Sequence, residues 1–393
     1  MGYSTQREIG IVNRDMKKIA PSMIRKVMES LSEMKNPANF SIGAPCHNPS
    51  ELFKVGLINA INDGKAGYTP SIGIKDLREE IVKYFAKRNI ITDSDHTVVT
   101  GGTTQLINSL LYCIGSSGDD VGIIRPSFVI YPEQTKIHKK NPIYIDFDKN
   151  TLLPDIEDLR KKSKEHNLKS IVFSSPGNPT GVVYPKETLE LIAEIANDRN
   201  SDGTKTWIIF DQIYDEFLYG DALNNYTRMA QIYKRTMSVG GPAKSLAIPG
   251  YRLACGAIPN DEIMEAMETH LLYHHVNAPT HNQLAFLYAL QNGAMDTLQG
   301  MRNMYGKRRD IAYKELTKIF GNFGPKPEGA FYIFVPIPEQ FSSDEFMKLA
   351  KKEEIVVVPG KAFGADRYFR LSYSVKSIDS IREGIQRFSR FVK

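Results

Sequence analysis

The sequence lacks the features that mark secreted, membrane and disulfide-rich proteins. It has only three cysteines in 393 residues, Cys46, Cys113 and Cys255, and their wide spacing fits neither a disulfide framework nor a metal site. We interpret them as buried, reduced thiols. No apolar run reaches transmembrane length, and the charges of Arg7 and Arg14 leave no apolar core for a signal peptide. We therefore predict a cytoplasmic protein with no membrane association and no structural metal.

The sequence also lacks a strong excess of charge. Its 50 basic and 45 acidic residues give a net charge of +5 and are scattered, without a basic block interleaved with aromatic residues. Nucleic acid is therefore not expected as a partner. Hydrophobic residues make up 41% and charged residues 24%, without low-complexity tracts, as in folded globular proteins. A chain of this length usually needs more than one hydrophobic core, which predicts two domains.

From about residue 75 the chain alternates helical patterns with short apolar runs. Leu77, Ile81 and Phe85 recur every four residues in 75–88, which predicts a helix, and further helices are predicted over 103–113 and 186–200. Strands are predicted over 96–100, 121–124, 143–147, 170–173, 207–210, 236–239 and 253–258. Several of these runs lack polar alternation. That pattern indicates strands buried on both faces, as in a mostly parallel sheet sandwiched by helices.

The last quarter of the chain has a different pattern. A long helical pattern runs from residue 281 towards residue 319, and strand-like runs follow at 331–335, 355–358 and 369–373. This order predicts a second, smaller α+β domain.

The segments that follow the predicted strands carry polar and glycine-rich motifs. They are GGTTQ at 101–105, SSPGNPTG at 174–181, DQIY at 211–214 and GGPAK ending at Lys244. Each motif alone is equally consistent with a turn or a helix cap. Ligands of open α/β sheets gather outside the carboxyl ends of the strands, so together these motifs predict a site there.

In order along the chain, these motifs and five others resemble the class I/II aminotransferase family of pyridoxal-phosphate-dependent enzymes. The other five are SIGAP at 41–45, GYTPSIGIKDLR at 67–78, RPSFVIYPEQ at 125–134, EGAFYIF at 328–334 and VVPGKAFG with FRLSYS at 357–374. The resemblance implies fold type I, with a mostly parallel seven-stranded sheet. It also implies three segments: an N-terminal arm with part of the small domain (1–50), a large cofactor-binding domain (51–290) and a small domain (291–393).

The resemblance implies pyridoxal 5′-phosphate as the cofactor and assigns residues to its ring. Lys244 matches the Schiff-base lysine, and a lysine attacks an aldehyde only when its amine is deprotonated. Asp211 matches the carboxylate partner of the pyridinium nitrogen, and Tyr214 and Asn178 match the partners of the phenolic oxygen. Phe128 occupies the position of the aromatic ring that stacks on the cofactor.

Further matches concern the cofactor phosphate. Gly102, Thr103 and Thr104 open a predicted helix, where backbone N–H groups bind anions, and Arg252, eight residues after the lysine, supplies positive charge. Tyr68 matches a tyrosine that reaches the phosphate from the neighbouring subunit. The resemblance therefore implies a homodimer with shared active sites.

The substrate side is implied by Arg370 in FRLSYS, which matches the arginine that binds the α-carboxylate with two parallel hydrogen bonds. Asn178 and the backbone N–H of Gly43 match groups that assist it. The implied reaction moves an amino group from an L-amino acid to a 2-oxo acid in a ping-pong cycle.

The sequence departs from the family pattern at three places. Gly241 replaces a serine that donates to the phosphate, and Cys46 and His47 replace an acidic–aromatic pair after SIGAP. His274 and His275 stand where relatives line the partner's pocket, and they either select a substrate or pack. These departures leave open a lyase, decarboxylase or oxidase reaction on the same scaffold. A non-catalytic effector domain is disfavoured, because no helix-turn-helix pattern precedes residue 41.

Overall fold

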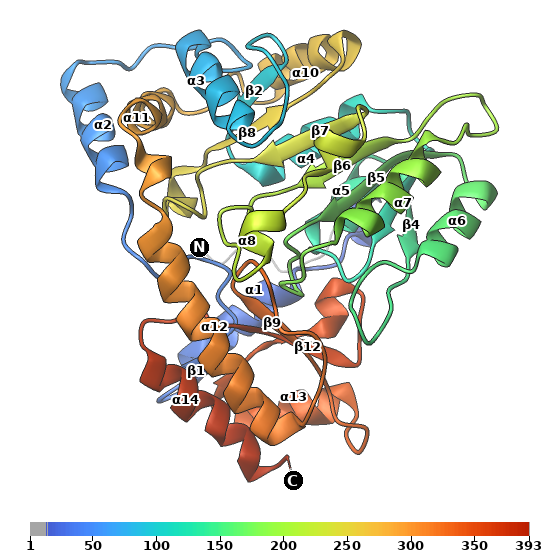
Figure 1. Ribbon diagram of the computed structural model, residues 1–393, viewed down its shortest axis with the longest axis vertical. Helices are drawn as coiled ribbons and strands as arrows, with labels where there is room; N and C mark the ends of the chain where they lie inside the picture. The colour runs from blue at the N-terminus through green and yellow to red at the C-terminus, as the bar shows by residue number, and fades with distance from the viewer. Residues whose placement is uncertain (1–12, 14, 393) are drawn as a thin grey trace, which may run out of the picture.

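A computed structural model describes residue 13 and residues 15–392, and its largest element is a seven-stranded sheet (Figure 1). The strand order is β2-β8-β7-β6-β5-β3-β4, and only the pairs made by β8 are antiparallel. The strands are β2 (Thr97–Thr100), β3 (Asp120–Ile124), β4 (Asn141–Ile145), β5 (Leu168–Ser174), β6 (Trp207–Asp211), β7 (Thr236–Gly240) and β8 (Ala254–Ala257). The predicted mostly parallel sheet of seven strands is confirmed.

The central strands are buried on both faces because their alternate side chains enter two different cores. In β6, Ile208 and Phe210 pack with helices α6 (Ile156–Glu165) and α7 (Lys186–Asn197). The intervening Ile209 packs with helices α4 (Thr103–Cys113) and α10 (Asp261–His274) on the opposite face. Two apolar faces explain why the predicted runs lack polar alternation.

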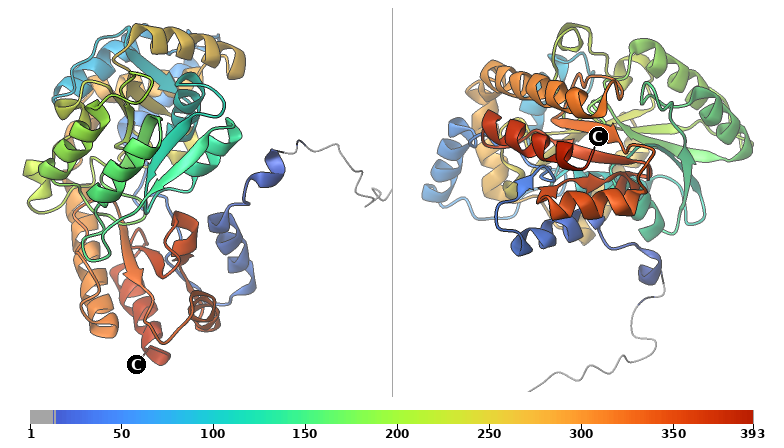
Figure 2. Two further views of the ribbon diagram at one scale, coloured as in Figure 1. Left: turned by 90° about the vertical axis from the view of Figure 1, so that its right-hand side faces the viewer. Right: turned by 90° about the horizontal axis from the view of Figure 1, so that it is seen from below.

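A second body of structure, the small C-terminal body, is formed by the C-terminal elements together with the segment before helix α2 (Glu51–Asn62). A three-stranded antiparallel sheet has the order β11-β12-β9, and β1 pairs in parallel with β10. These elements are β1 (Ala38–Asn39), β9 (Tyr332–Pro336), β10 (Ile355–Val356), β11 (Val358–Pro359), β12 (Tyr368–Ser372), α13 (Ser343–Lys352) and α14 (Ile378–Gln386). Figure 2 shows the blue α1 (Met23–Glu29) beside these red and orange elements. An aromatic-rich core lies beneath them, and Phe334, Val358 and Tyr368 pack instead with the core of α6 and α7.

The long helical pattern predicted after residue 281 proved to be two helices. α11 (Thr280–Gln291) ends where Gly293 adopts a left-handed conformation, and a 3₁₀ turn, Ala294–Asp296, follows. α12 (Gln299–Phe320) then runs from the large sheet to the C-terminal elements (Figure 1). The periodicity continued across the break because apolar residues of the turn also face a core.

The remaining helices are α2 (Glu51–Asn62), α3 (Lys75–Ala86), α5 (Ile130–Ile137), α8 (Ala222–Asn225) and α9 (Met229–Ile232). All three cysteines are free thiols, but only Cys255 is buried, so the expectation of burial is wrong for the half-buried Cys46 and Cys113. No helix among the described residues is long and apolar enough to cross a membrane. Arg7 and Arg14, on which the expectation about a signal peptide rests, lie outside the described residues.

Candidate active site

The segments after β2, β5, β6 and β7 meet at one edge of the large sheet, where β12 and the segment after β1 join them. Lys244 lies in the turn after β7, and its Nζ donates to the Gly43 carbonyl at 2.6 Å. Burial lowers the pKa of this lysine to about 8, and the charges of Arg370 and Arg252 lower it while that of Asp211 raises it. A neutral amine is therefore accessible near physiological pH.

Asp211 ends β6 and is a buried carboxylate with two hydrogen-bond donors. The Tyr131 hydroxyl donates to Oδ2 at 2.8 Å, and the Ile213 backbone N–H donates to Oδ1 at 3.1 Å. Burial raises the pKa of Asp211 to about 6, although both donors lower it. Tyr131 was not singled out from the sequence. The signal was its place one turn after Phe128 in RPSFVIYPEQ, on a helix that packs against the sheet.

The first turn of α4 forms a cradle with Arg252. Gly102 caps the helix with φ +112, and a Cβ atom there would collide with the Arg252 guanidinium. Thr103 and Thr104 are the first two helical residues, so their N–H groups have no intrahelical partners. A glycine is needed here because both the backbone conformation and the approach of the arginine exclude a side chain.

Arg370 is the largest fully buried side chain, on β12. Its Nη1 donates to Asn178 Oδ1 at 3.0 Å and its Nη2 to the Ser41 carbonyl at 2.7 Å. Its Nε has no hydrogen-bond partner among the described residues. A buried guanidinium with a spare N–H suits a carboxylate ligand.

Tyr214 and Tyr332 meet between the two sheets. Their hydroxyl oxygens lie 2.7 Å apart, and the Arg370 guanidinium lies 4.4 Å from the centroid of the Tyr332 ring. Tyr332, in EGAFYIF, was also not singled out from the sequence, because its contacts come from β12 and from the segment after β6.

Cys46 and His47 join a small polar cluster beside the lysine turn. His47 Nε2 lies 3.1 Å from the Ser245 carbonyl, which only accepts, so Nε2 carries the proton and Nδ1 accepts from the Tyr305 hydroxyl at 3.2 Å. The Arg308 guanidinium contacts the Cys46 thiol, and the Cys46 backbone N–H donates to Tyr305. Burial lowers the pKa of His47, and the charge of Arg308 adds to that effect.

Replacing His47 with glutamine is expected to reduce the loss of unfolding free energy that the protein suffers at acidic pH. The folded protein disfavours the protonated ring, so wild-type stability falls as pH drops below the ordinary histidine pKa of about 6.5. Glutamine keeps a donor for Ser245 and does not titrate. The free energy of unfolding, measured in denaturant at about pH 7.5 and about pH 5, should fall less in His47→Gln than in the wild type.

His96→Gln is the matched control, with the opposite sign. Despite partial burial, Asp93 and Asp261 raise the pKa of His96, so its contribution to stability is fully present at low pH and is lost as pH rises. This variant should therefore lose more stability than the wild type on acidification. An unchanged profile in His47→Gln would contradict the assignment of a neutral His47.

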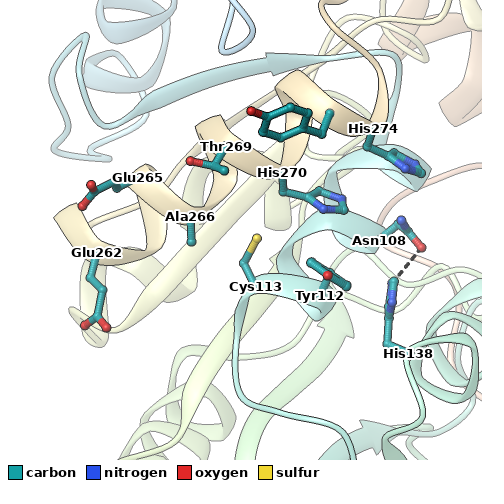
Figure 3. A pocket seen from close by; sticks show the side chains of 11 residues that line it. Asn108, Tyr112, Cys113, His138, Glu262, Glu265, Ala266, Thr269, His270 and His274 are labelled. Atoms are coloured by element: carbon teal, nitrogen blue, oxygen red, sulfur yellow. Dashed lines mark hydrogen bonds between the residues drawn. The ribbon is translucent and has the colours of Figure 1, made fainter.

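The side chains of the other residues predicted from the sequence make no hydrogen bond to the residues around Lys244, within the part of the chain that the structure describes. Phe128 is half-buried, with its ring edge-on to Tyr131 at 6.0 Å, and Tyr68 is 90% exposed. His275 Nε2 approaches the turn before α4, 3.3 Å from the position of a Cβ on Gly101. His274 instead stacks on His270 in an open pocket of about 860 Å³ between α4 and α10 (Figure 3).

The structure also explains the missing serine at position 241. Gly241 has φ +138, and a Cβ atom there would lie 2.8 Å from Ala254 Cα. A serine would therefore collide with the β8 backbone instead of reaching an anion.

Comparison with known proteins fits this arrangement. Residues 35–388 match the family described as aminotransferase class I and II. The chain belongs to the class I and II aminotransferases. A probable aspartate/prephenate aminotransferase of Aquifex aeolicus is 34% identical over 89% of this chain and 90% of its own length. An aspartate aminotransferase of Bacillus sp. (strain YM-2) is 31% identical over 98% of this chain and 99% of its own.

Solved structures agree with the sequence match. The aspartate aminotransferase of Thermus thermophilus with maleate superposes with a TM-score of 0.89 at 27% identity, covering 97% of this chain and 100% of that one. An aromatic aminotransferase of Pyrococcus horikoshii gives a TM-score of 0.84 at 28% identity, covering 93% and 98%. The aminotransferase described here thus has fold type I and is an enzyme that transfers amino groups.

Proposed function

We propose that this aminotransferase holds pyridoxal 5′-phosphate between Asp211 and the start of α4, and uses Lys244 to move an amino group from an L-amino acid to a 2-oxo acid. When bound, the cofactor supplies the electron sink for the reaction. The observation that carries the proposal is the placement of the Lys244 amine, whose pKa is lowered to about 8, near a buried carboxylate and a buried guanidinium.

The residues at the edge of the sheet fit the cofactor. The N-terminus of α4 and Arg252 offer oriented N–H groups and a positive charge for a phosphate, and Gly102 leaves space for the Arg252 guanidinium. Burial raises the pKa of the Asp211 carboxyl to about 6, although the charge of Lys244 lowers it, so Asp211 suits a cationic pyridinium partner. Phe128, Asn178 and Tyr214 would contact the cofactor ring.

The roles of the substrate-side residues follow from their chemistry. Arg370 would hold the α-carboxylate, with Asn178 and the Gly43 N–H beside it, and so orient the α-carbon. Lys244 would hold the cofactor covalently and, once freed by the substrate amine, carry the proton of the α-carbon as a general base. The small C-terminal body, which carries Arg370, would exclude water when it closes.

A half-reaction tests the proposed chemistry. The purified holoenzyme is mixed with one L-amino acid and no 2-oxo acid, and the amount of 2-oxo acid formed per subunit is measured. Aspartate and the aromatic amino acids are the first donors to test, since the relatives are named for them. We expect one equivalent of 2-oxo acid per subunit and no further turnover until a second 2-oxo acid is added. Continuous release of ammonia or carbon dioxide would instead indicate a lyase, decarboxylase or oxidase.

Tyr131→Phe is expected to weaken cofactor binding. The change removes one of the two donors of Asp211, and a hydrogen bond to a charged group contributes about 1.5–3 kcal/mol. The pKa of Asp211 should rise, and the dissociation constant of the cofactor should increase roughly tenfold or more. Equilibrium dialysis measures this dissociation constant. Tyr233→Phe is the control, because its hydroxyl donates to Ala196 and Thr206 carbonyls elsewhere.

We propose a homodimer in which Tyr68 completes the partner's site. The support is apolar surface in the single chain: Tyr68 and Tyr273 are strongly exposed, and so are Ile58 and Ile61 of α2. Exposed apolar surface of this kind commonly marks an interface. We further propose that each subunit has a large domain over 51–290 and a small domain over 291–393, with residues 1–50 forming an N-terminal arm and part of the small domain.

Hybrid dimers test the shared site. A Lys244→Ala subunit paired with a Tyr68→Ala subunit contains one site with both native residues, so the hybrid dimer should have about half of the wild-type activity, and an equimolar mixture after random exchange about a quarter. Subunit exchange is verified with differently tagged chains. Hybrids no more active than their parents would contradict a shared site.

A further inference from the structure

The contact between Tyr214 and Tyr332 joins the two bodies of the enzyme. Tyr214 follows β6 of the large sheet and Tyr332 begins β9 of the smaller sheet, and both side chains are buried. Their hydroxyl oxygens lie 2.7 Å apart, and either can be the donor. The direction of this bond decides where the proton of Tyr214 points.

A count of protons links that direction to the proposed role of Tyr214. Burial raises the pKa of both tyrosines, so each keeps its proton at neutral pH. Two hydroxyl groups in contact share one proton between their oxygens, and the other proton is available to another acceptor. If Tyr214 donates to the phenolic oxygen of the cofactor, as the proposed function requires, then the proton between the two tyrosines belongs to Tyr332.

The surroundings hold Tyr332 in the position that this role needs. Its ring packs under the Arg370 guanidinium, 4.4 Å from Cζ to the ring centroid, and edge-on to Tyr214 at 5.6 Å. Its hydroxyl faces Gly43, where a Cβ atom would lie 3.2 Å away. The hydroxyl therefore has little freedom to leave Tyr214.

We propose that Tyr332 is a positioning residue that donates its hydroxyl proton to Tyr214 and thereby directs the Tyr214 proton towards the cofactor. The same ring also packs against Arg370. Tyr332 therefore contacts both the arginine that would bind the carboxylate and Tyr214, which would donate to the cofactor. This inference rests on the proposed role of Tyr214.

The test is the pH midpoint of the visible absorbance change of the holoenzyme, which reports the proton on the nitrogen that joins Lys244 to the cofactor. A donor on the phenolic oxygen withdraws electron density and makes that nitrogen less basic. We expect Tyr214→Phe to raise the midpoint by about one pH unit or more. Tyr332→Phe should raise it by roughly 0.3–0.6 unit, since a neighbouring donor strengthens a hydrogen bond by only part of its value.

Tyr373→Phe is the matched control. Tyr373 is equally buried in the same small body, and its hydroxyl donates to the Ala330 carbonyl at 3.1 Å, away from the site. It should leave the midpoint unchanged. Tyr332→Met, which also removes the donor, gives the same test if Tyr332→Phe does not fold.

The outcomes separate this inference from the proposed function. A midpoint that moves in Tyr214→Phe but not in Tyr332→Phe overturns the role of Tyr332 and leaves the function standing. No movement in either variant overturns the assignment of Tyr214 and this inference with it. A tenfold rise of KM for the amino acid in Tyr332→Phe, without a shift of the midpoint, would show that Tyr332 donates to the substrate carboxylate instead.

Discussion

Replacing Lys244 with alanine is expected to lower kcat by at least about 10⁴-fold, because the variant lacks both the covalent hold on the cofactor and the general base. In the wild type the amine has a lowered pKa of about 8 and is held by the Gly43 carbonyl. Attachment of added cofactor to the cofactor-free protein should therefore speed up as pH rises through about 8 and level off at higher pH, where the amine is fully deprotonated. Single-turnover kinetics and absorbance measure the two effects.

The control for this variant is Lys361→Ala, which removes an exposed lysine of the C-terminal body. Borohydride treatment followed by peptide mapping should place a pyridoxyl group on Lys244 in the wild type and in Lys361→Ala, and on no lysine in Lys244→Ala. A pyridoxyl group on any other lysine would contradict the assignment.

Much of the fold could be predicted because it depends on local patterns. The strands from β2 to β8 are apolar runs bounded by turn residues, and α4 was predicted with its observed bounds, Thr103–Cys113. The break between α11 and α12 could not be predicted, because the turn after Gly293 packs with the core and preserves the apolar periodicity. Periodicity reports burial, and it does not distinguish a helix from a turn that shares the same core.

The residues that sequence reasoning missed are those defined by distant partners. Tyr131 donates to Asp211, which lies 80 residues away, and Tyr332 contacts Tyr214, which lies 118 residues away. The local sequence does not distinguish Tyr332 from a core aromatic residue, and it marks Tyr131 only by its place one turn after Phe128. For Gly241 the sequence showed the departure from the family pattern but not its reason. The reason is the close approach of the β8 backbone, which leaves no room for a side chain.

Replacing Arg370 with lysine is expected to lower kcat/KM for the amino acid by roughly 10²–10³-fold while the cofactor stays bound. The guanidinium uses two nitrogens on Asn178 and Ser41 and keeps Nε free, and a lysine ammonium cannot occupy these three positions at once. Loss of one or two charge-assisted hydrogen bonds to the carboxylate, about 1.5–3 kcal/mol each, accounts for that range. Steady-state kinetics with a fixed 2-oxo acid measure it.

Arg367→Lys is the matched control on the same segment, because Arg367 is exposed and its guanidinium donates to the Phe341 and Pro338 carbonyls away from the site. It should keep near wild-type kinetics. If Arg370→Lys also kept the wild-type kcat/KM, then Arg370 would serve only to join Asn178 to Ser41. The free energy of unfolding should fall in either case, since the ammonium would leave the buried Asn178 oxygen or the Ser41 carbonyl without a donor. The kinetics therefore distinguish a group that binds the substrate carboxylate from one that only holds two segments of the chain together, and denaturation of the same variant measures the structural part of its role.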